Sequence, residues 1–302
     1  MQRGIEGALN INFARLKNAF YFPVGSMNRL YESEIVSRIE RLDGKAEVRK
    51  IGILNYDHRD YPLFYLITHN TNPSSPNVFI SAGIHGDEPA GVYAALDFVK
   101  NHAQEYAKEF NFIVFPCLNP WGFEKGRHEN LNKFNLNREF RKASPEKEIR
   151  LLKIALEHEA KQFCFAIDMH EDEPRQQIKH YPISQNPNGF YLFETCPQEE
   201  SLGRKIINTL ESSSFPICNR DKIYHDKNDN GLVWEPKVTD KGEDDQTTLM
   251  CYLEDYSGHV FNPETISSWE FDKRVQSHKI VLETILDEFR KRSEEIKWRT
   301  KS

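Results

Sequence analysis

The stretch NVFISAGIHGDEPAGVYAALDFVKNHAQEY, residues 77–106, decides the fold class of this chain. It begins with a short apolar run, residues 77–84, which is typical of a strand covered on both faces. A polar turn follows, and then a helical pattern over 88–106. Pro89 lies in the first turn of that helix, where its missing N–H costs nothing. A buried strand that leads through a turn into a helix is the repeating unit of α/β folds.

The rest of the chain repeats this alternation, with no internal repeat or low-complexity linker. The patterns predict strands over 46–56, 61–70, 110–118, 163–170, 189–195 and 247–256, and helices over 27–43, 144–162, 197–213 and 268–294. This order predicts an α/β fold with a mixed, mostly parallel central sheet covered by helices on both faces. We expect two parts. Residues 1–44 form an N-terminal extension and helix packed on a catalytic domain, 45–302, in which the loop-rich stretch 214–246 is an elaborated rim.

Composition excludes several classes of protein. With 302 residues the chain can bury a large core, and its net charge of −6 offers no basic footprint for nucleic acid. No apolar run approaches the roughly 20 residues that cross a bilayer, and the N-terminus has no signal-peptide pattern. Five scattered cysteines without a CxxC pair are typical of reduced thiols. We therefore expect a cytoplasmic protein without membrane or nucleic-acid partners, and its oligomeric state stays open.

Polar residues follow several of the predicted strands. His85 and Glu88 come after the first buried strand, and His170 ends another. Glu254 ends the strand predicted over 247–256, and Arg138 lies in an amide-rich segment after a further strand. Because ligand sites in open α/β sheets form at the carboxyl ends of strands, these side chains are expected to meet at one edge.

Two histidines and a carboxylate suit catalytic zinc, which takes three protein ligands and leaves one position for water. A further carboxylate must move the proton of that water, and an arginine can bind a substrate carboxylate through two parallel hydrogen bonds. Each residue alone also has a simpler interpretation. An HxxE pair arises by chance, His170 and Arg138 could be surface residues, and Glu254 could begin an acidic turn. The joint pattern favours one site.

The motifs GIHGDEPAG, NPWGF, NLNREF and DMHEDE, followed by a late strand ending in glutamate, together resemble the zinc carboxypeptidase family. The sequence is similar in particular to the compact bacterial branch of that family, which includes murein tripeptide amidase. More distantly, it resembles succinylglutamate desuccinylase and aspartoacylase. The resemblance covers residues 45–295.

The resemblance implies one zinc ion per chain, with His85, Glu88 and His170 as its ligands. It implies that Glu254 is the general base that activates the zinc-bound water. Zinc in such a site lowers the pKa of the water and polarises the scissile carbonyl.

The resemblance also assigns residues to the substrate. Asn137 and Arg138 would bind its terminal carboxylate. Arg127 is the nearest match to the family's electrophilic arginine, which stabilises negative charge on the carbonyl. Arg127 falls one position early, however, and His128 sits close to the slot.

Two departures from the family pattern leave questions open. Asn135 stands where the family usually has an aspartate that orients a zinc-binding histidine. Its amide oxygen can accept the same hydrogen bond without the charge, or Asp168 and Glu171 compensate from beside the third ligand. The family's loop tyrosine has no clear match, and Tyr224 and Tyr252 are the alternatives.

Three functions fit these residues. The first is zinc-dependent hydrolysis of an amide beside a free carboxylate, by a metallocarboxypeptidase or peptide amidase acting on a small peptide. The second is a zinc-dependent deacylase of N-acyl amino acids, of the succinylglutamate desuccinylase/aspartoacylase type. Those deacylases follow the catalytic glutamate with a β-rich domain, whereas only 48 residues follow Glu254, so the first is favoured. The third is an inactive metal-binding relative, which should have lost a ligand or the base. Substrate identity stays open.

Overall fold

The computed structural model describes residues 29–42, 44–68, 75–140, 143–159, 162–173, 181–235 and 247–299, with side chains described up to residue 293. Most of the predicted N-terminal extension and the acidic stretch 240–246 of the predicted rim lie outside these residues. Among the described residues, no helix is long and apolar enough to cross a membrane.

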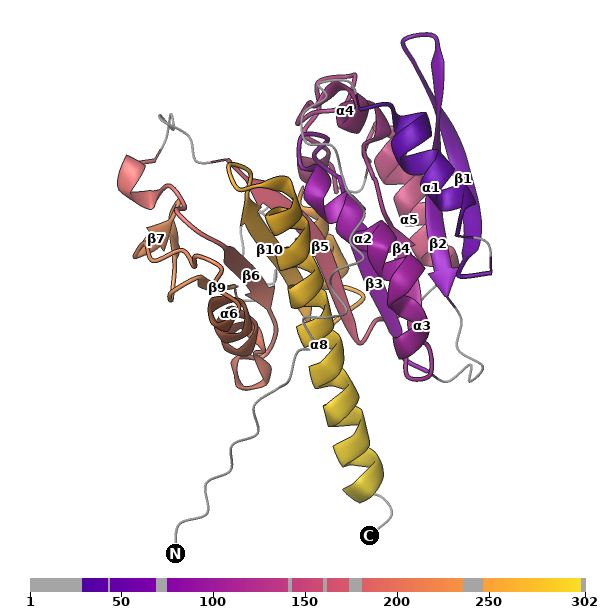
Figure 1. The fold of residues 1–302 in the computed structure, drawn as a ribbon. Helices are drawn as coiled ribbons and strands as arrows, with labels where there is room; N and C mark the ends of the chain where they lie inside the picture. The colour runs from indigo at the N-terminus through magenta and orange to yellow at the C-terminus, as the bar shows by residue number, and fades with distance from the viewer. Residues whose placement is uncertain are drawn as a thin grey trace, which may run out of the picture.

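An eight-stranded sheet of order β1-β2-β4-β3-β5-β10-β6-β9 forms the centre of the molecule (Figure 1). Its strands are β1 (Glu47–Tyr56), β2 (Arg59–Thr68), β3 (Asn77–Ala82), β4 (Asn111–Phe115), β5 (Phe165–Asp172), β6 (Tyr191–Thr195), β9 (Leu232–Glu235) and β10 (Val260–Ile266). The pairs β3–β4, β3–β5, β5–β10 and β6–β9 are parallel, and the other three pairs are antiparallel. The predicted mixed, mostly parallel sheet is confirmed.

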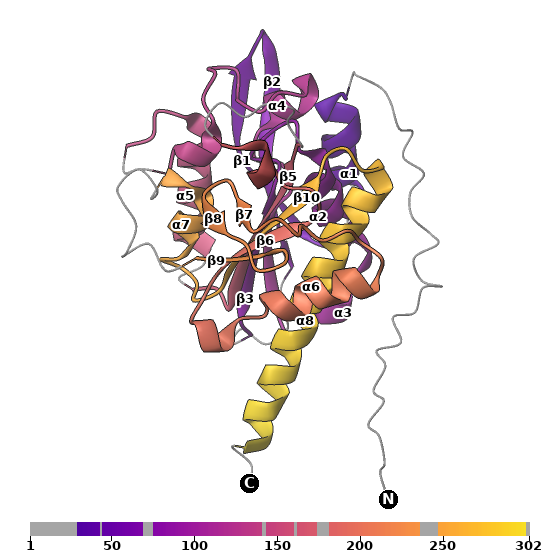
Figure 2. The ribbon, with the colours of Figure 1, turned by 90° about the vertical axis from the view of Figure 1, so that its left-hand side faces the viewer.

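Helices cover both faces of this sheet (Figure 2). One face carries α2 (Pro89–Asn101), α3 (Ala103–Tyr106), α6 (Gly203–Ser212) and α8 (Phe271–Arg299), and the other carries α5 (Lys147–Glu159) and α7 (Leu249–Leu253). The shorter elements are η2 (Glu32–Val36), α1 (Ser37–Glu40), α4 (Pro120–Lys125), the 3-10 turns η3 (Leu136–Arg138), η4 (Ile183–Gln185) and η5 (Gln198–Glu200), and the hairpin β7 (Lys222–Ile223)–β8 (Asp226–Lys227).

The first residues of β5 are apolar, and its polar side chains lie from Asp168 onwards. All eight residues of β5 are buried. Successive side chains of a strand point to opposite faces, so Ile167 and Met169 join the core beneath α2 and α8, while Ala166 joins the core beneath α5 and α7. Asp168, His170 and Asp172 share the face of Ala166. The strand therefore carries these three side chains on the α7 side, whereas Glu171 lies on the face covered by α2 and α8.

The strand predicted over 247–256 is wrong. Residues 249–253 form the helix α7, whose amino end is capped by Thr248: the side-chain oxygen accepts a hydrogen bond from the backbone N–H of Cys251. A short apolar run such as LMCYL does not distinguish a buried strand from a buried helix by periodicity. The strand in this region is β10, residues 260–266, which contains Pro263. Proline lacks the N–H of a sheet ladder, so the sequence argues against a central strand there.

The structure adds detail to the predictions for residues 214–246 and 27–43. The stretch 214–246 is more than a rim, because β9 within it is the edge strand of the main sheet and pairs with β6. The helix predicted over 27–43 is present as η2 and α1, and Tyr31, Ile35 and Ile39 of this segment are buried in the core. The five cysteines are all unpaired, as expected.

Candidate metal centre

The loop between β3 and α2 holds the first two predicted ligands in a backbone path that only glycine permits. A Cβ atom added at Gly86 would lie 1.9 Å from the backbone carbon of Gly122, so this loop touches helix α4 through its main chain. Pro89 begins α2, as expected, and Glu88 is the residue that precedes it. The side chain of Glu171, on β5, accepts a hydrogen bond from the N–H of Ala90. The start of α2 is thereby tied to the strand that carries His170.

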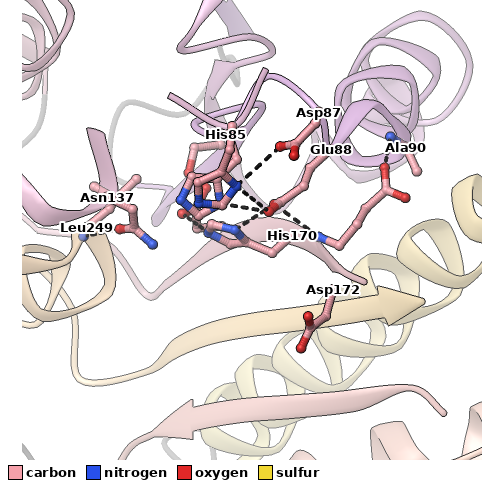
Figure 3. A network of polar contacts seen from close by, with 12 residues as sticks. His85, Asp87, Glu88, Ala90, Asn137, His170, Asp172 and Leu249 are labelled. Atoms are coloured by element: carbon pink, nitrogen blue, oxygen red, sulfur yellow. Dashed lines mark hydrogen bonds and ion pairs between the residues drawn. The ribbon is translucent and has the colours of Figure 1, made fainter. Parts of the chain in front are cut away.

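His85 and His170 lie on either side of the Glu88 carboxylate (Figure 3). The Nδ1 atom of His85 is 2.7 Å from Glu88 Oε1, and the Nδ1 atom of His170 is 2.9 Å from Glu88 Oε2. All three side chains are buried. The fold therefore brings together the three residues that the sequence singled out as zinc ligands, although His170 is 82 positions away from Glu88 in the chain.

The outer ring nitrogens of both histidines have hydrogen-bond acceptors. His85 Nε2 lies 3.1 Å from Asn135 Oδ1, and His170 Nε2 lies 2.8 Å from Asp168 Oδ2. The identity of the Asn135 oxygen is set by the backbone, because the N–H of Asn137 donates to it at 2.9 Å. Each Nε2 therefore carries a proton, and a neutral ring then has a bare Nδ1. Asn135 therefore accepts a hydrogen bond from His85, and Asp168 accepts one from His170, so both alternatives left open by the sequence occur in the structure.

The bare Nδ1 atom of His85 favours a cation at this point. Burial lowers the pKa of His85 and outweighs the opposing pull of Glu88, so this ring is neutral and presents a lone pair to a carboxylate oxygen. Two acceptors at such a distance repel unless a positive ion lies between them. Burial also disfavours charge on His170, but Asp168 and Glu88 overcome it and raise the pKa of His170 well above its ordinary range. Two imidazole nitrogens and one carboxylate fit a divalent ion such as zinc and leave a coordination position open.

His128 also lies within ligand distance but with the wrong orientation. Ligand atoms of His85, Glu88 and His128 all lie within 4.8 Å of one another. The rings of His85 and His128 are stacked, however, with centroids 3.7 Å apart and planes inclined by 21°. A metal bound by a histidine lies in the ring plane about 2 Å from the nitrogen, and two stacked planes do not meet within that reach. The ring of His170 is inclined by 62° to that of His85, which allows both to face one ion.

Glu264 is a further carboxylate beside His170. Glu264 of β10 is the register partner of His170 on the parallel strand β5, so both side chains share a face of the sheet. Burial raises the pKa of Glu264 well above its ordinary range; the attraction of His170 opposes this shift, and the carboxylates of Glu88, Asp172 and Asp168 add to it. No described residue forms a hydrogen bond with its carboxylate.

Glu254, the base expected from the sequence, does not share this position. It follows the last residue of α7, and Tyr256, two residues on, accepts a hydrogen bond from the N–H of Phe163. Phe163 lies two residues before β5, about 23 Å along the chain from His170 at roughly 3.3 Å per residue. The sequence analysis missed Glu264 because Pro263 argues against a strand there, and VFNPETI does not alternate regularly between apolar and polar residues.

The residues expected to contact substrate lie beside the centre, with one exception. The side-chain oxygen of Asn137 accepts from the N–H of Leu249, at the start of α7, at 2.8 Å, which leaves its Nδ2 atom as a donor (Figure 3). Arg138 is exposed and one guanidinium nitrogen donates to the carbonyl oxygen of Asn137. Arg127 is the exception: it is exposed, and no described contact joins its side chain to the three ligands. His128 stands there instead.

Asp172 extends the polar face two residues beyond His170. The hydroxyl groups of Tyr191 and Tyr224 both donate to its Oδ2 atom, at 2.6 and 2.5 Å. Tyr224 thus reaches the neighbourhood of the centre. Tyr252 lies elsewhere, with its hydroxyl 3.1 Å from that of Tyr256. Of the two tyrosines left open by the sequence, only Tyr224 is placed near the ligands.

Comparisons with known proteins identify one similar sequence family and several similar folds. Residues 74–193 match the model of the succinylglutamate desuccinylase/aspartoacylase catalytic domain. No curated protein matches the chain in sequence.

Among solved structures, the chain is similar to a candidate metallopeptidase from Shewanella amazonensis SB2B, with a TM-score of 0.66 and 22% identity over 85% of this chain and 91% of that one. It is also similar to a metallo-carboxypeptidase from Burkholderia cenocepacia, with a TM-score of 0.59 and 16% identity over 84% of this chain and 68% of that one. A metallo-carboxypeptidase from Pseudomonas aeruginosa gives a TM-score of 0.57 and 14% identity over 84% and 68%. These likenesses show a shared fold. Residues 74–193 are therefore similar to the succinylglutamate desuccinylase/aspartoacylase catalytic domain, and the chain has a zinc carboxypeptidase-like fold.

Proposed function

We propose that this chain is a zinc-dependent hydrolase that cleaves an amide bond next to a free carboxylate, as a metallocarboxypeptidase or peptide amidase does. His85, Glu88 and His170 are the proposed ligands of one zinc ion per chain. The observation that carries the proposal is the approach of two histidine Nδ1 atoms to the two oxygens of one buried carboxylate. Three protein ligands leave room for water and substrate, which is the mark of a catalytic rather than a structural zinc site.

Glu264 is the proposed general base, in place of Glu254. A zinc ion bound to the three ligands would polarise the amide carbonyl, lower the pKa of a water molecule and offset the negative charge around Glu264. The Glu264 carboxylate would accept a proton from the attacking water and deliver it to the leaving amine. Its place beside His170 in the β5–β10 register puts it on the face where the ligands converge.

Asn137 and Arg138 are the proposed anchors of the substrate carboxylate. The Nδ2 atom of Asn137 is held as a donor by the bond that its oxygen makes to α7, and the exposed guanidinium of Arg138 can bind a carboxylate through two hydrogen bonds. The similar fold from Pseudomonas aeruginosa was solved with (2-guanidinoethylmercapto)succinic acid, a ligand that carries carboxylates. This supports a carboxylate-bearing substrate here.

The alternative function is a zinc-dependent deacylase of N-acyl amino acids. The match of residues 74–193 to the succinylglutamate desuccinylase/aspartoacylase catalytic domain favours it. Both functions use the same ligands and base and differ only in the acyl side of the bond. The expected partner is a small peptide or an acyl amino acid. The unpaired cysteines support the proposal of a cytoplasmic enzyme.

The test is hydrolysis by the zinc-loaded protein of C-terminal peptides, γ-D-glutamyl-diaminopimelate peptides and N-acyl amino acids, each beside an amidated counterpart. Cleavage of free-carboxylate peptides alone supports the first function, and cleavage of acyl amino acids alone supports the alternative. Glu264→Gln should retain zinc and lower kcat by about 10²- to 10⁴-fold, as expected for a lost general base. The matched control Glu254→Gln should keep the wild-type rate. The reverse result would contradict the assignment of the base.

A further inference from the structure

A chain of hydrogen bonds leads from the ligand His85 to Asp87. Asn135 links the two histidines: its oxygen faces His85 Nε2, and its Nδ2 atom lies 3.3 Å from His128 Nε2. At the far end, His128 Nδ1 lies 3.3 Å from Asp87 Oδ1. Asp87 directly precedes the proposed ligand Glu88, so this series of hydrogen bonds begins and ends on the same loop, between β3 and α2. Neither Asn135 nor His128 has a place in the proposed ligand set.

The direction of every bond in this chain follows from one backbone donor. The N–H of Asn137 can only donate, so the Asn135 atom that it contacts is the oxygen. The other amide atom is then an NH₂ group, which can only donate to His128. His128 Nε2 is therefore an acceptor, and its proton is on Nδ1, where Asp87 accepts it. The backbone thus sets the tautomers of two histidines through a single amide.

His128 also contacts the face of His85. The stacked rings, 3.7 Å apart, leave His85 no room to tilt towards His128, while 30% of the His128 side chain is still exposed to solvent. The ring of His85 is therefore held in its plane by stacking and about its axis by the bond to Asn135. These constraints are independent of each other, because one involves the ring face and the other involves Nε2.

We propose that Asn135 and His128 are a matched pair of positioning residues for the metal ligand His85. Asn135 decides which nitrogen of His85 is bare, and His128 fixes the ring plane and requires an amide at position 135. A carboxylate there could accept from His85 equally well, but it has no N–H for His128 Nε2. This inference rests on the proposed zinc site, because the role of the pair is to present Nδ1 of His85 to the ion.

The first experiment needs no zinc. Two-bond ¹H–¹⁵N correlation spectra of the metal-free, full-length protein report which ring nitrogen of each histidine carries the proton. We expect His128 in the Nδ1–H form and a change of that form in Asn135→Asp. His128 found in the Nε2–H form in the wild-type protein would overturn the proposal, whatever the protein does with zinc.

The second experiment measures zinc affinity by chelator competition in a double-mutant cycle. Asn135→Asp should weaken zinc binding by about 10- to 100-fold, the usual effect of a lost outer hydrogen bond. In a His128→Ala background the same substitution should change the affinity by less than about threefold, because its unfavourable partner is gone. Equal factors in both backgrounds would overturn the pairing.

Two further variants complete the experiment, one as a replacement for His128→Ala and one as a control. His128→Phe keeps a stacking ring without Nε2, so it should behave as His128→Ala does towards Asn135→Asp and should keep the absorption spectrum of the cobalt-substituted wild type. It replaces His128→Ala if that variant does not fold. His158→Ala is the matched control, since 75% of the His158 side chain is exposed and it lies on α5. If the wild-type protein binds no zinc, the proposed function fails, while the tautomer spectra still decide the pairing.

Discussion

Among the described residues, two buried clusters contain residue types that bind metals, and they differ in the hydrogen-bond partners of their atoms. One is the proposed ligand set, His85, Glu88 and His170. The other, called here the β6 cluster, contains Glu194, Cys196 and His259, whose ligating atoms lie within 4.8 Å of one another. In the first cluster each histidine Nδ1 lies within 2.9 Å of a Glu88 oxygen, so both clusters are compact. The hydrogen bonds separate them.

In the β6 cluster the carboxylate is already satisfied by donors. Glu194 accepts hydrogen bonds from the N–H groups of Leu202 and Gly203 and from the hydroxyl of Ser201, so it caps the start of α6. Burial and the hydrogen bond to Glu194 raise the pKa of Cys196 to about 12, which keeps the thiol protonated.

The ring of His259 completes the contrast. Its Nε2 atom bonds to Glu200 at 2.9 Å, and only Nδ1 lacks a hydrogen-bond partner among the described residues. The carboxylate of Glu88 faces two ring nitrogens besides the N–H of Glu171, whereas the partners of the Glu194 carboxylate are donor groups. The contact that favours a metal is the one between two acceptors, the bare Nδ1 of His85 and Oε1 of Glu88, and not proximity alone.

The largest effect should come from removing one ligand of the first cluster. His170→Ala should lower zinc affinity by more than about 100-fold, beyond the loss seen for outer-sphere changes, and should reduce the bound metal from one ion per chain to none. Cys196→Ala should leave metal content unchanged. Elemental analysis of the purified proteins measures both. If Cys196→Ala lost the metal and His170→Ala kept it, the metal would be bound by the β6 cluster and not by the first cluster.

A smaller effect is expected on stability when the cap of α6 is removed. Glu194→Ala leaves two backbone N–H groups without their acceptor, which should lower the free energy of unfolding by about 2–3 kcal/mol, with unchanged zinc content. Thermal or denaturant unfolding of the metal-free protein provides the measurement. The control is Glu200→Ala, whose side chain is 51% exposed and should cost less than about 1 kcal/mol. A change in zinc content with Glu194→Ala would refute a purely structural role.

The smallest expected effect is a pH dependence of zinc affinity at the first cluster. Because Asp168 and Glu88 raise the pKa of His170 against the cost of burial, a proton occupies Nδ1 of the metal-free protein until the pH exceeds that pKa. Zinc must displace this proton, so its affinity should rise about tenfold per pH unit below the raised pKa.

Stability of the metal-free protein should change in the opposite sense. The charged His170 stabilises the native state fully below the ordinary histidine pKa of about 6.5, and this contribution disappears as pH rises through the raised pKa. Zinc titrations and unfolding midpoints over a pH series test both signs. A zinc affinity independent of pH would show that His170 Nδ1 is not a ligand atom. His259→Ala should keep the same slope.

Local patterns in the sequence determined the main parts of this protein. The alternation of buried strands and helices predicted the mixed α/β sheet, and the strand–turn–helix of residues 77–106 placed His85 and Glu88 before α2. His170 at the end of a fully buried strand was likewise predictable. These features depend on the two-residue period of a strand and on the preference for proline in the first turn of a helix, both of which act over a few neighbouring residues.

The tertiary structure decided which further residues join the ligands. Glu264, rather than Glu254, stands beside His170 because the register of β10 on β5 brings it there, and packing overrode the local signal of Pro263. His128, rather than Arg127, stacks on His85 because the loop after α4 packs against the loop after β3. Register and loop packing depend on contacts between segments distant in the chain, and no short stretch of sequence specifies them.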